Sequence, residues 1–480
     1  MRPVGKITYV LLCFYLFTSH LSYSQKKKTS PADVATQWAT MTTQVMTAAP
    51  KNSPTYGSRA LGYLGLTMYE TVVWSNPSYR SIATSLCDTL SMPKPIAQKA
   101  YCWELALNAG QAYLLKQLYG YTNKMNPVDS LANVIHTQYA AKKSKSVVQR
   151  SEEFGKAIAE TIYNWSKSDG GYEGYTRNFP PDFVNLAGTG LWVPPIAGQS
   201  RSEIPLHPAW GKNRTFIRQN GLLPNPEPMQ YSVDSTSRYY KGYKEVYDRK
   251  KTLTAADHEI IYWWGDDPSE TCSPPGHSYN LATIAIKKSN ASLPLAAQTY
   301  CRVGMAVADA FIMCWRTKYA YNVERPSTFI RKHLDTIQNY IDGGWRSAFP
   351  EPPFSAFYSG HATQSAATAT VLTDIYGDNF SFVDDTHINR KGGYAYKNYY
   401  YYLKFKPRQF ASFWESAKEC AESRLLGGIH TRHDNDTGLA EGTKIGRNVN
   451  AIQWTNQPNH SRKQASSRTY KRTSRIVALH

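Results

Sequence analysis

Long apolar segments are scarce in this sequence. Beyond residues 7–17 no run approaches the roughly 20 apolar residues that a spanning helix needs, so we expect no stable membrane insertion. The 7 cysteines include no CxxC pair, which gives a structural zinc site little support. No long stretch alternates between apolar and polar residues as a half-buried strand does. These absences leave a soluble helical protein as the expectation.

Acidic residues are also few, with 36 Asp and Glu against 55 Lys and Arg and a formal net charge of +19. Much of the excess lies in the terminal segments, at residues 26–28 and in a tail from Asn456 that contains no acid. Such runs are typically solvated and flexible, so the charge does not predict nucleic-acid binding. The 41% hydrophobic residues are enough for a sizeable core, which excludes a wholly disordered chain.

The N-terminus has the pattern of a secretory signal. Arg2 and Lys6 precede the apolar run Ile7–Phe17, and Ser22-Tyr23-Ser24 forms a small-x-small cleavage site before Gln25. An uncleaved anchor is the alternative, disfavoured because the run is shorter than a membrane span. We therefore expect an exported protein, periplasmic or secreted.

Export permits disulfide bonds. Cleavage would remove Cys13 and leave six cysteines, among which Cys87 and Cys102 are the plausible pair. Two free core thiols are an equal alternative.

Hydrophobic periodicity and capping signals predict an all-α protein. Ser30-Pro31 resembles a helix start, and Thr254 with Asp257 resembles a capping box. The expected helices cover residues 31–49, 59–74, 98–119, 126–142, 148–167, 232–250, 254–264, 295–323, 327–341, 361–376, 408–427 and 435–450. The expected organisation is a signal peptide (1–24), an N-terminal helical bundle with a long connecting loop (30–230), a C-terminal bundle with the site (231–455) and a basic flexible tail (456–480).

Lys318 and Arg325 open the chemically interesting part of the chain. They are seven positions apart, about two helical turns, and so lie near one face. Pro326 disfavours helical geometry at Arg325, so the helix should end there and the guanidinium can turn back into a site. Alone, the pair could equally be two basic residues at a helix end, where the dipole favours them.

Ser359-Gly360-His361 precedes a helix of small residues. A helix start offers free backbone N–H groups to an anion, Gly360 permits close approach, and His361 is placed to act as an acid–base group. Ser359 could also be a simple N-cap.

Arg424 lies late in the following helix, which Gly427-Gly428 should end. His430 then comes from a turn, and Asp434 could accept its second ring N–H, fixing the tautomer. Alternatively, His430 could be an ordinary loop histidine and Asp434 a helix cap. We assign His433 to the ordinary loop histidines. His277, in Pro274-Pro275-Gly276-His277, is interpreted as a helix-start residue rather than a ligand.

Together the blocks supply one Lys, two Arg, a hydroxyl, a glycine amide and two His, a set suited to a tetrahedral oxyanion. Their order and spacing, KX6RP, SGH and SRX5HX3D, resemble the signature of the superfamily of vanadium-dependent haloperoxidases and type 2 phosphatidic acid phosphatases. The resemblance implies that vanadate or phosphate oxygens are held by Lys318, Arg325, Ser359, Gly360 and Arg424. His430 would be the axial vanadium ligand or the phosphorylated nucleophile, and His361 and Asp434 would assist catalysis. Tyr358 departs from the commonest pattern, which has Pro there.

Length and flanking residues are similar to those of bacterial exported haloperoxidases with two helical bundles. The flanks lie around Asp309 to Asn322, Pro352 to Phe354 and Gly427 to His430, with weaker similarity at Arg59-Ala60 and Pro208 to Gly211. By this resemblance Trp315 and Phe354 would line the halide side of the pocket, core packing being the alternative.

The resemblance thus implies a vanadate-dependent haloperoxidase with vanadate as cofactor. Hydrogen peroxide, polarised by Lys318, would oxidise iodide or bromide to a hypohalous-acid-like species that halogenates small organic substrates. An exported acid phosphatase acting through a phosphohistidine at His430 is the enzymatic alternative, and a cell-surface protein binding polyanions through its tail is the non-enzymatic one. The sequence leaves open the halide, the organic substrate and whether the chain forms a homo-oligomer.

Overall fold

The computed structural model describes residues 30–456 apart from 197, 269, 336–343, 389 and 397–398. The predicted signal peptide and nearly all of the basic tail lie outside the described residues. Within them helices dominate, which confirms the all-α class. No helix of the described part is long and apolar enough to span a membrane.

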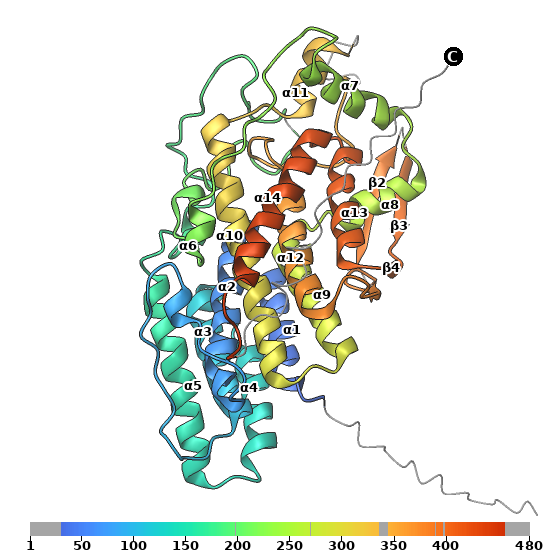
Figure 1. The fold of residues 1–480 in the computed structure, drawn as a ribbon. Helices are drawn as coiled ribbons and strands as arrows, with labels where there is room; N and C mark the ends of the chain where they lie inside the picture. The colour runs from blue at the N-terminus through green and yellow to red at the C-terminus, as the bar shows by residue number, and fades with distance from the viewer. Residues whose placement is uncertain are drawn as a thin grey trace, which may run out of the picture.

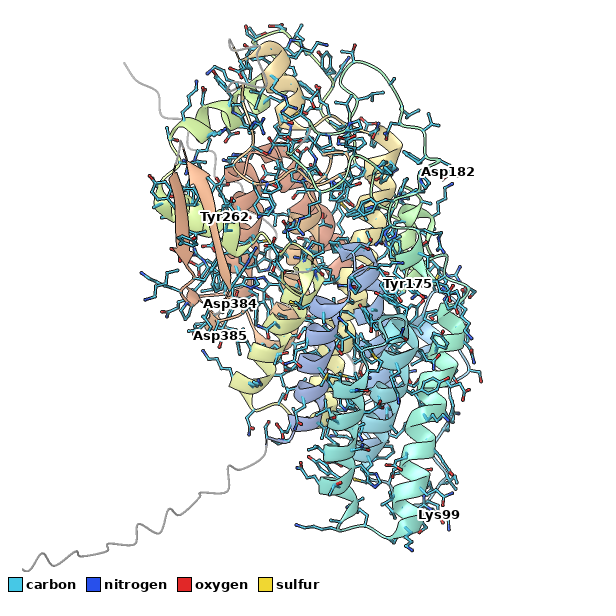
Figure 2. The ribbon with its side chains drawn as sticks, turned by 180° about the vertical axis from the view of Figure 1, so that it is seen from behind. Lys99, Tyr175, Asp182, Tyr262, Asp384 and Asp385 are labelled. Carbon is cyan, nitrogen blue, oxygen red and sulfur yellow. The ribbon has the colours of Figure 1, made fainter. Side chains whose placement is uncertain are left out.

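The molecule is elongated, with α3, α4 and α5 at one end and α7, α11 and a β-hairpin toward the other (Figure 1). Lys99 lies at the far tip of the α3–α5 end, as the view from behind shows (Figure 2). The helices are α1 (Asp33–Ala48), α2 (Pro54–Val72), α3 (Trp103–Tyr119), α4 (Asn126–Ala140), α5 (Lys145–Ser166), α6 (Arg218–Gly221), α7 (Arg238–Lys251), α8 (Ala255–Trp263), α9 (Ser273–Ser289), α10 (Leu293–Tyr321), α11 (Pro326–His333), α12 (Gly360–Tyr376), α13 (Phe413–Leu426) and α14 (Arg432–Asn450).

Helices α2 and α10 pack against each other at the centre of the main core, whose buried residues extend from Ala32 to Trp454. A helix that is apolar on all sides is expected to be buried. Most of the 29 residues of α10 are buried. Glycines allow the two backbones to touch: a Cβ at Gly65 would lie 2.6 Å from the Tyr300 carbonyl oxygen, and one at Gly304 2.4 Å from that of Leu61. The N-terminal and C-terminal halves therefore share one core.

Helices α12 and α14 are joined in the same way. Gly438, Gly442 and Gly446 face α12 at four-residue spacing, and a Cβ at Gly442 would lie 2.1 Å from the Thr363 carbonyl oxygen. This contact brings the start of α12 close to the turn before α14, the two places where the second and third sequence blocks lie.

Two small antiparallel pairs were not predicted. Strand β1 (Phe382–Asp384) pairs with β4 (Arg408–Phe410), and β2 (Lys391–Tyr396) with β3 (Tyr399–Lys404). The helix expected over residues 408–427 therefore begins only at Phe413, because residues 408–410 are held in a strand by a partner distant in sequence.

The helix starts test the capping predictions. The capping box of Thr254 and Asp257 is confirmed at α8. The start at Ser30 is wrong: the N-cap of α1 is Ala32, with no side-chain cap, because Ser30 and the residues after it form a turn first. Helix α2 begins at Pro54, earlier than predicted, because Ser53 caps it. The end predicted for the helix over 327–341 lies outside the described residues, and α11 ends at His333.

All six cysteines among the described residues are free, so the predicted Cys87–Cys102 bridge does not form and the free-thiol alternative holds. Cys102 is buried and Cys87 is partly exposed.

Candidate active site

Lys318 and Arg325 reach one buried place from the end of α10. Lys318 lies in the last turn of α10, and Arg325 is the N-cap of α11 with extended backbone (φ −80°, ψ 155°), the conformation that Pro326 imposes. Their exposed fractions are 0% and 1%. The Lys318 Nζ donates to the carbonyl oxygens of Ser355 (2.9 Å) and Ala356 (2.7 Å), and burial lowers its pKa to about 7.

Arg325 bonds to the segments that precede the second block, at Phe354, and His430 of the third block, at Ile429. Its Nε donates to the Phe354 carbonyl oxygen at 2.9 Å, and its Nη1 to that of Ile429 at 2.8 Å. Burial lowers its pKa to about 10, so the guanidinium stays charged at neutral pH.

Ser359 is the N-cap of α12, its side chain accepting from the Ala362 amide at 3.4 Å. Its own amide donates to the Asp434 carbonyl oxygen at 3.1 Å, which joins the second block to the third. His361 follows in the first turn, where burial and the charge of Arg424 hold its pKa well below the usual value. The N-cap role and an anion-binding role are compatible, because the Ser359 side chain pairs only one of the free backbone N–H groups at the start of α12.

Arg424 enters from the last turn of α13. Its Nη2 donates to the carbonyl oxygens of Ile261 (3.1 Å) and Trp264 (2.9 Å). Gly428 has a φ of +77°, which glycine adopts without strain, and the chain turns there toward His430. As predicted, a glycine pair ends the helix before the histidine.

His430 is held through both ring nitrogens. Its Nε2 lies 3.2 Å from Nη1 of Arg325 and its Nδ1 lies 3.3 Å from Oδ2 of Asp434. Because an arginine only donates, Nε2 is the acceptor and Nδ1 carries the proton. Burial, with the nearby cations, lowers the pKa to about 3 and keeps the ring neutral. Asp434 also closes a capping box with Thr431 at the start of α14, so its capping and orienting roles coincide.

Three buried nitrogen atoms of this group have no hydrogen-bond partner in the described part of the chain. They are Nη2 of Arg325, Nη1 of Arg424 and Nε2 of His361. Buried polar groups in proteins are nearly always paired, so the unpaired donors of the two arginines, which come from separate helices, call for a ligand rich in acceptors. The residues present therefore fit a vanadate- or phosphate-like oxyanion.

A cavity of about 240 Å³ leads to this group, lined among others by Phe354, His361, Arg424 and several prolines. The Phe354 ring lies under Lys318 Nζ (5.2 Å) and the Arg325 guanidinium (5.1 Å). Trp315 is not among the lining residues: its ring packs 4.8 Å from that of Phe354 and its Nε1 donates to the Leu206 carbonyl oxygen. Of the two predicted halide-pocket residues, Phe354 faces the cavity and Trp315 supports it.

The long connection before α7 covers the site. The Leu206 amide donates to the Pro353 carbonyl oxygen (2.9 Å), and the Glu351 amide to that of Gln199 (2.8 Å). Contributions of this kind, with the carbonyls of Ser355 and Trp264, were missed from the sequence because any residue type has a backbone carbonyl. The ring of Phe349, which lies 5.0 Å from the Arg424 guanidinium, was missed because isolated aromatic residues give no local signal.

The other two histidines singled out from the sequence are not in this group. His433 stacks on Phe357 (5.4 Å between ring centroids), and His277 lies buried early in α9 between Asp266 and Asp384.

Comparisons with known proteins identify chains with the same fold. Residues 298–457 match the family described as the VCPO second helical-bundle domain. The crystal structure of a bacterial vanadium-dependent iodoperoxidase is 29% identical, with a TM-score of 0.75 over 88% of this chain and 97% of that one. No curated protein matches the sequence.

Two structures of a bacterial vanadium-dependent chloroperoxidase share the fold at lower identity. The apo form is 15% identical (TM-score 0.60, covering 84% of this chain and 93% of that one). The holo form is 16% identical (TM-score 0.60, covering 83% and 92%).

Fold and site thus define an all-α protein whose helix ends converge on an oxyanion pocket. Residues 298–457 match that haloperoxidase domain family, and the chain shares its fold with bacterial vanadium-dependent haloperoxidases, so the resemblance predicted from its motifs is confirmed.

Proposed function

We propose that this enzyme is a vanadate-dependent haloperoxidase that oxidises iodide or bromide with hydrogen peroxide. The product would be a hypohalous-acid-like species that halogenates small organic compounds. The proposal is carried by the three unpaired nitrogen atoms of Arg325, Arg424 and His361 around a histidine whose Nε2 is unprotonated. These groups match an oxyanion that also accepts a nitrogen ligand.

When bound, vanadate supplies a Lewis-acidic centre that activates hydrogen peroxide without changing the oxidation state of the metal. The chain holds it through Nε2 of His430, the cations Lys318, Arg325 and Arg424, the Ser359 hydroxyl and the Gly360 amide. The cationic side chains are buried and their pKa values are lowered by burial, so a bound anion restores the charge of Lys318 in particular.

His361 and Asp434 have different tasks. Nε2 of His361 is unpaired at the cavity and can give a proton to, or take one from, a substrate oxygen. Asp434 accepts a hydrogen bond from Nδ1 of His430 and so keeps the lone pair on Nε2, where an incoming ligand would replace the contact with Arg325. Phe354 lines the path by which halide would arrive, and the Lys318 ammonium would hold and polarise an oxygen of the oxyanion. Export to the periplasm or the medium is part of the same proposal and rests on the N-terminal sequence.

The test uses the chain from Gln25 onward, incubated with orthovanadate and assayed for iodide and bromide oxidation by peroxide beside phosphate-ester hydrolysis. Halide oxidation that requires vanadate is expected, and it should disappear in His430→Ala. The matched control is His433→Ala, which removes a histidine that stacks on Phe357 and does not line the cavity, so the variant should retain the activity.

Ester hydrolysis that vanadate inhibits, with no halide oxidation, would instead assign the site to an acid phosphatase with a phosphohistidine at His430. Deletion of residues 457–480 should leave halide oxidation intact, whereas a surface protein that binds polyanions would lose its binding.

A further inference from the structure

Four buried side chains form a hydrogen-bonded chain beside the proposed site and take no part in the reaction above. Oδ2 of Asp384 lies 2.8 Å from Nε2 of His277, whose Nδ1 lies 2.8 Å from Oδ2 of Asp266. Oδ1 of Asp266 in turn lies 2.8 Å from Nε2 of His387. All four side chains are buried, with at most 4% of any residue exposed.

The contacts fix the charge of His277. Each of its ring nitrogens faces a carboxylate oxygen, and a carboxylate only accepts, so both nitrogens carry a proton and the ring is an imidazolium. Burial alone would lower the pKa of His277, but Asp266 and Asp384 raise it to about 10. The pKa of Asp266 is correspondingly held well below its usual value by His277 and His387, against the effect of burial.

Asp266, His277 and His387 also place one ligand atom each within 4.8 Å of one another, a set that could hold a metal ion. Around a tetrahedral zinc ion, with bonds of about 2.1 Å, neighbouring ligand atoms stand roughly 3.4 Å apart. Here each histidine lies 2.8 Å from a different oxygen of Asp266, the length of a hydrogen bond to an ionised group. The geometry therefore favours a proton between these groups.

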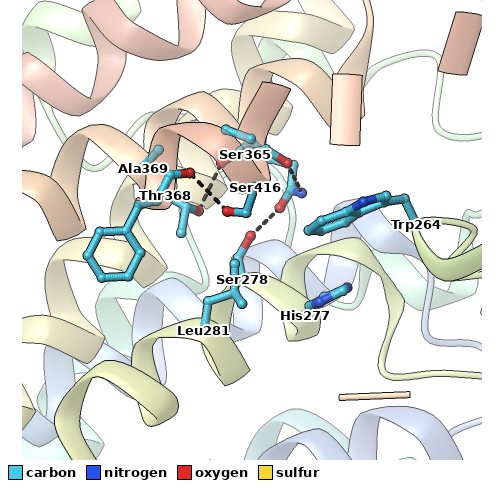
Figure 3. Close-up of a pocket in the computed structure, with 11 residues that line it drawn as sticks. Trp264, His277, Ser278, Leu281, Ser365, Thr368, Ala369 and Ser416 are labelled. Atoms are coloured by element: carbon cyan, nitrogen blue, oxygen red, sulfur yellow. Dashed lines mark hydrogen bonds between the residues drawn. The ribbon is translucent and has the colours of Figure 1, made fainter. Parts of the chain in front are cut away.

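The chain of side chains touches the oxyanion site through the turn after α8. The Trp264 carbonyl oxygen accepts from Arg424. The His361 side chain is also hydrogen-bonded to the backbone of Trp264. The ring of Trp264 stacks on that of His277 with centroids 4.7 Å apart. Both side chains line a small cavity of about 10 Å³, and Figure 3 shows how they lie. Asp266, two residues on, has a left-handed φ of +47°, a conformation that needs support from its surroundings.

Asp266 also matters through its charge. It lines the same cavity as His361 and Arg424, and its carboxylate raises the pKa of both. An uncompensated buried carboxylate at that place would repel an oxyanion, because charges interact strongly where water is excluded. The His277 imidazolium is the cation that directly faces it.

We infer that His277 is a positioning residue of the oxyanion site: clamped between Asp384 and Asp266, it fixes the turn from Trp264 to Asp266 and offsets the Asp266 charge. Arg424 and His361 are thereby held ready for an oxyanion. The inference rests on the proposed oxyanion site. Asp384 reaches the clamp from β1, on the hairpin side of the molecule (Figure 2), so this outlying part of the fold contributes to the site.

The test measures binding of orthovanadate to the vanadate-free full chain by titration calorimetry. His277→Gln keeps the size of the side chain and removes its charge, and we expect Kd to rise on the order of tenfold. Adding Asp266→Asn to this variant removes the repelling carboxylate and should recover most of the affinity. The control is His136→Gln, an exposed histidine paired with Glu152 in the distant bundle, which should leave Kd unchanged.

A histidine with a merely structural role would lower the melting temperature of His277→Gln but not its Kd, and that result would overturn the inference. A double variant that binds no better than His277→Gln would overturn it as well. Asp384→Asn weakens the clamp without emptying the core; it should raise Kd in the same direction, and an unchanged Kd would contradict the inference even if His277→Gln did not fold.

Stoichiometric zinc in the purified wild type would replace the proton-bridged chain by a metal site and overturn the inference. If the wild type binds neither orthovanadate nor inorganic phosphate, the oxyanion site itself fails, and the inference falls with it. If the wild type binds orthovanadate and the His277 variants bind it with the same Kd, the inference about His277 is wrong while the proposed oxyanion site stands.

Discussion

Nη1 of Arg325 lies 3.2 Å from Nε2 of His430, and this contact identifies Nε2 as the ring nitrogen that holds a lone pair. The arginine can only donate, so the nitrogen it approaches must hold a lone pair. Asp434 holds the proton on the other nitrogen, at 3.3 Å. A neutral, oriented imidazole therefore stands among cations before any ligand arrives, and the predictions below test the groups that keep it so.

Replacing Asp434 by Asn should weaken orthovanadate binding about tenfold, because a neutral amide oxygen accepts from Nδ1 of His430 more weakly than a carboxylate does and lowers the basicity of Nε2. The amide oxygen can still accept the Thr431 amide, so α14 keeps its cap. Calorimetric Kd values for the variant and the wild type, with melting curves as a check on folding, measure this. Equal Kd values would mean that Asp434 serves only as a cap.

Arg424→Lys should weaken orthovanadate binding by about tenfold or more while leaving a positive charge in place. A lysine cannot donate to the Trp264 carbonyl oxygen and also direct a second, fixed donor at the cavity, as Nη2 and Nη1 of Arg424 do. The same calorimetric titration tests it. Full affinity in the variant would show that charge alone, without the planar fork, is sufficient.

Gly442→Ala should destabilise the protein by about 2 kcal/mol, because the new Cβ would lie 2.1 Å from the Thr363 carbonyl oxygen and push α12 from α14. Since those helices carry His361 and follow His430, orthovanadate affinity should fall too. Denaturant unfolding and calorimetry measure the two effects. Gly120→Ala is the control: its φ is −56° and no atom lies within 4 Å of a Cβ there, so stability should change by less than about 0.5 kcal/mol.

Glu70 should make stability depend on pH. It is 1% exposed, and burial raises its pKa from 4.5 to about 7. The folded state then keeps this proton up to about pH 7, whereas the unfolded chain loses it near pH 4.5, so this group's contribution to stability falls as pH rises between those values and is constant above.

Glu70→Gln resembles the protonated acid and lacks that dependence. Relative to wild type it should therefore gain about 3 kcal/mol of unfolding free energy between pH 4 and pH 8. Urea unfolding at both pH values measures the difference. Glu160→Gln, at an exposed position of α5, should show no such change, and a flat difference for Glu70→Gln would contradict the raised pKa.

The predictable part of the fold was the part governed by local rules. Thr254 and Asp257 share a helix end through contacts three residues apart, and Pro326 acts on the residue before it, so both effects could be read along the chain. Residues 408–410 show the limit: they form a strand only because residues 382–384 pair with them. The Cys87–Cys102 pairing failed for the same reason, since no local pattern reports where two distant thiols lie.

By itself the sequence determined the helical class and the chemical groups of the site, because helix periodicity, proline and glycine act over a few residues and the spacings of the three blocks lie on the chain. Only the tertiary structure decided how these groups are used. It bonded each arginine to backbone carbonyls and left one nitrogen of each unpaired, set Trp315 behind Phe354, and placed His277 between two carboxylates. Those outcomes depend on which distant helices meet, and that is fixed by packing of the whole core rather than by any segment of it.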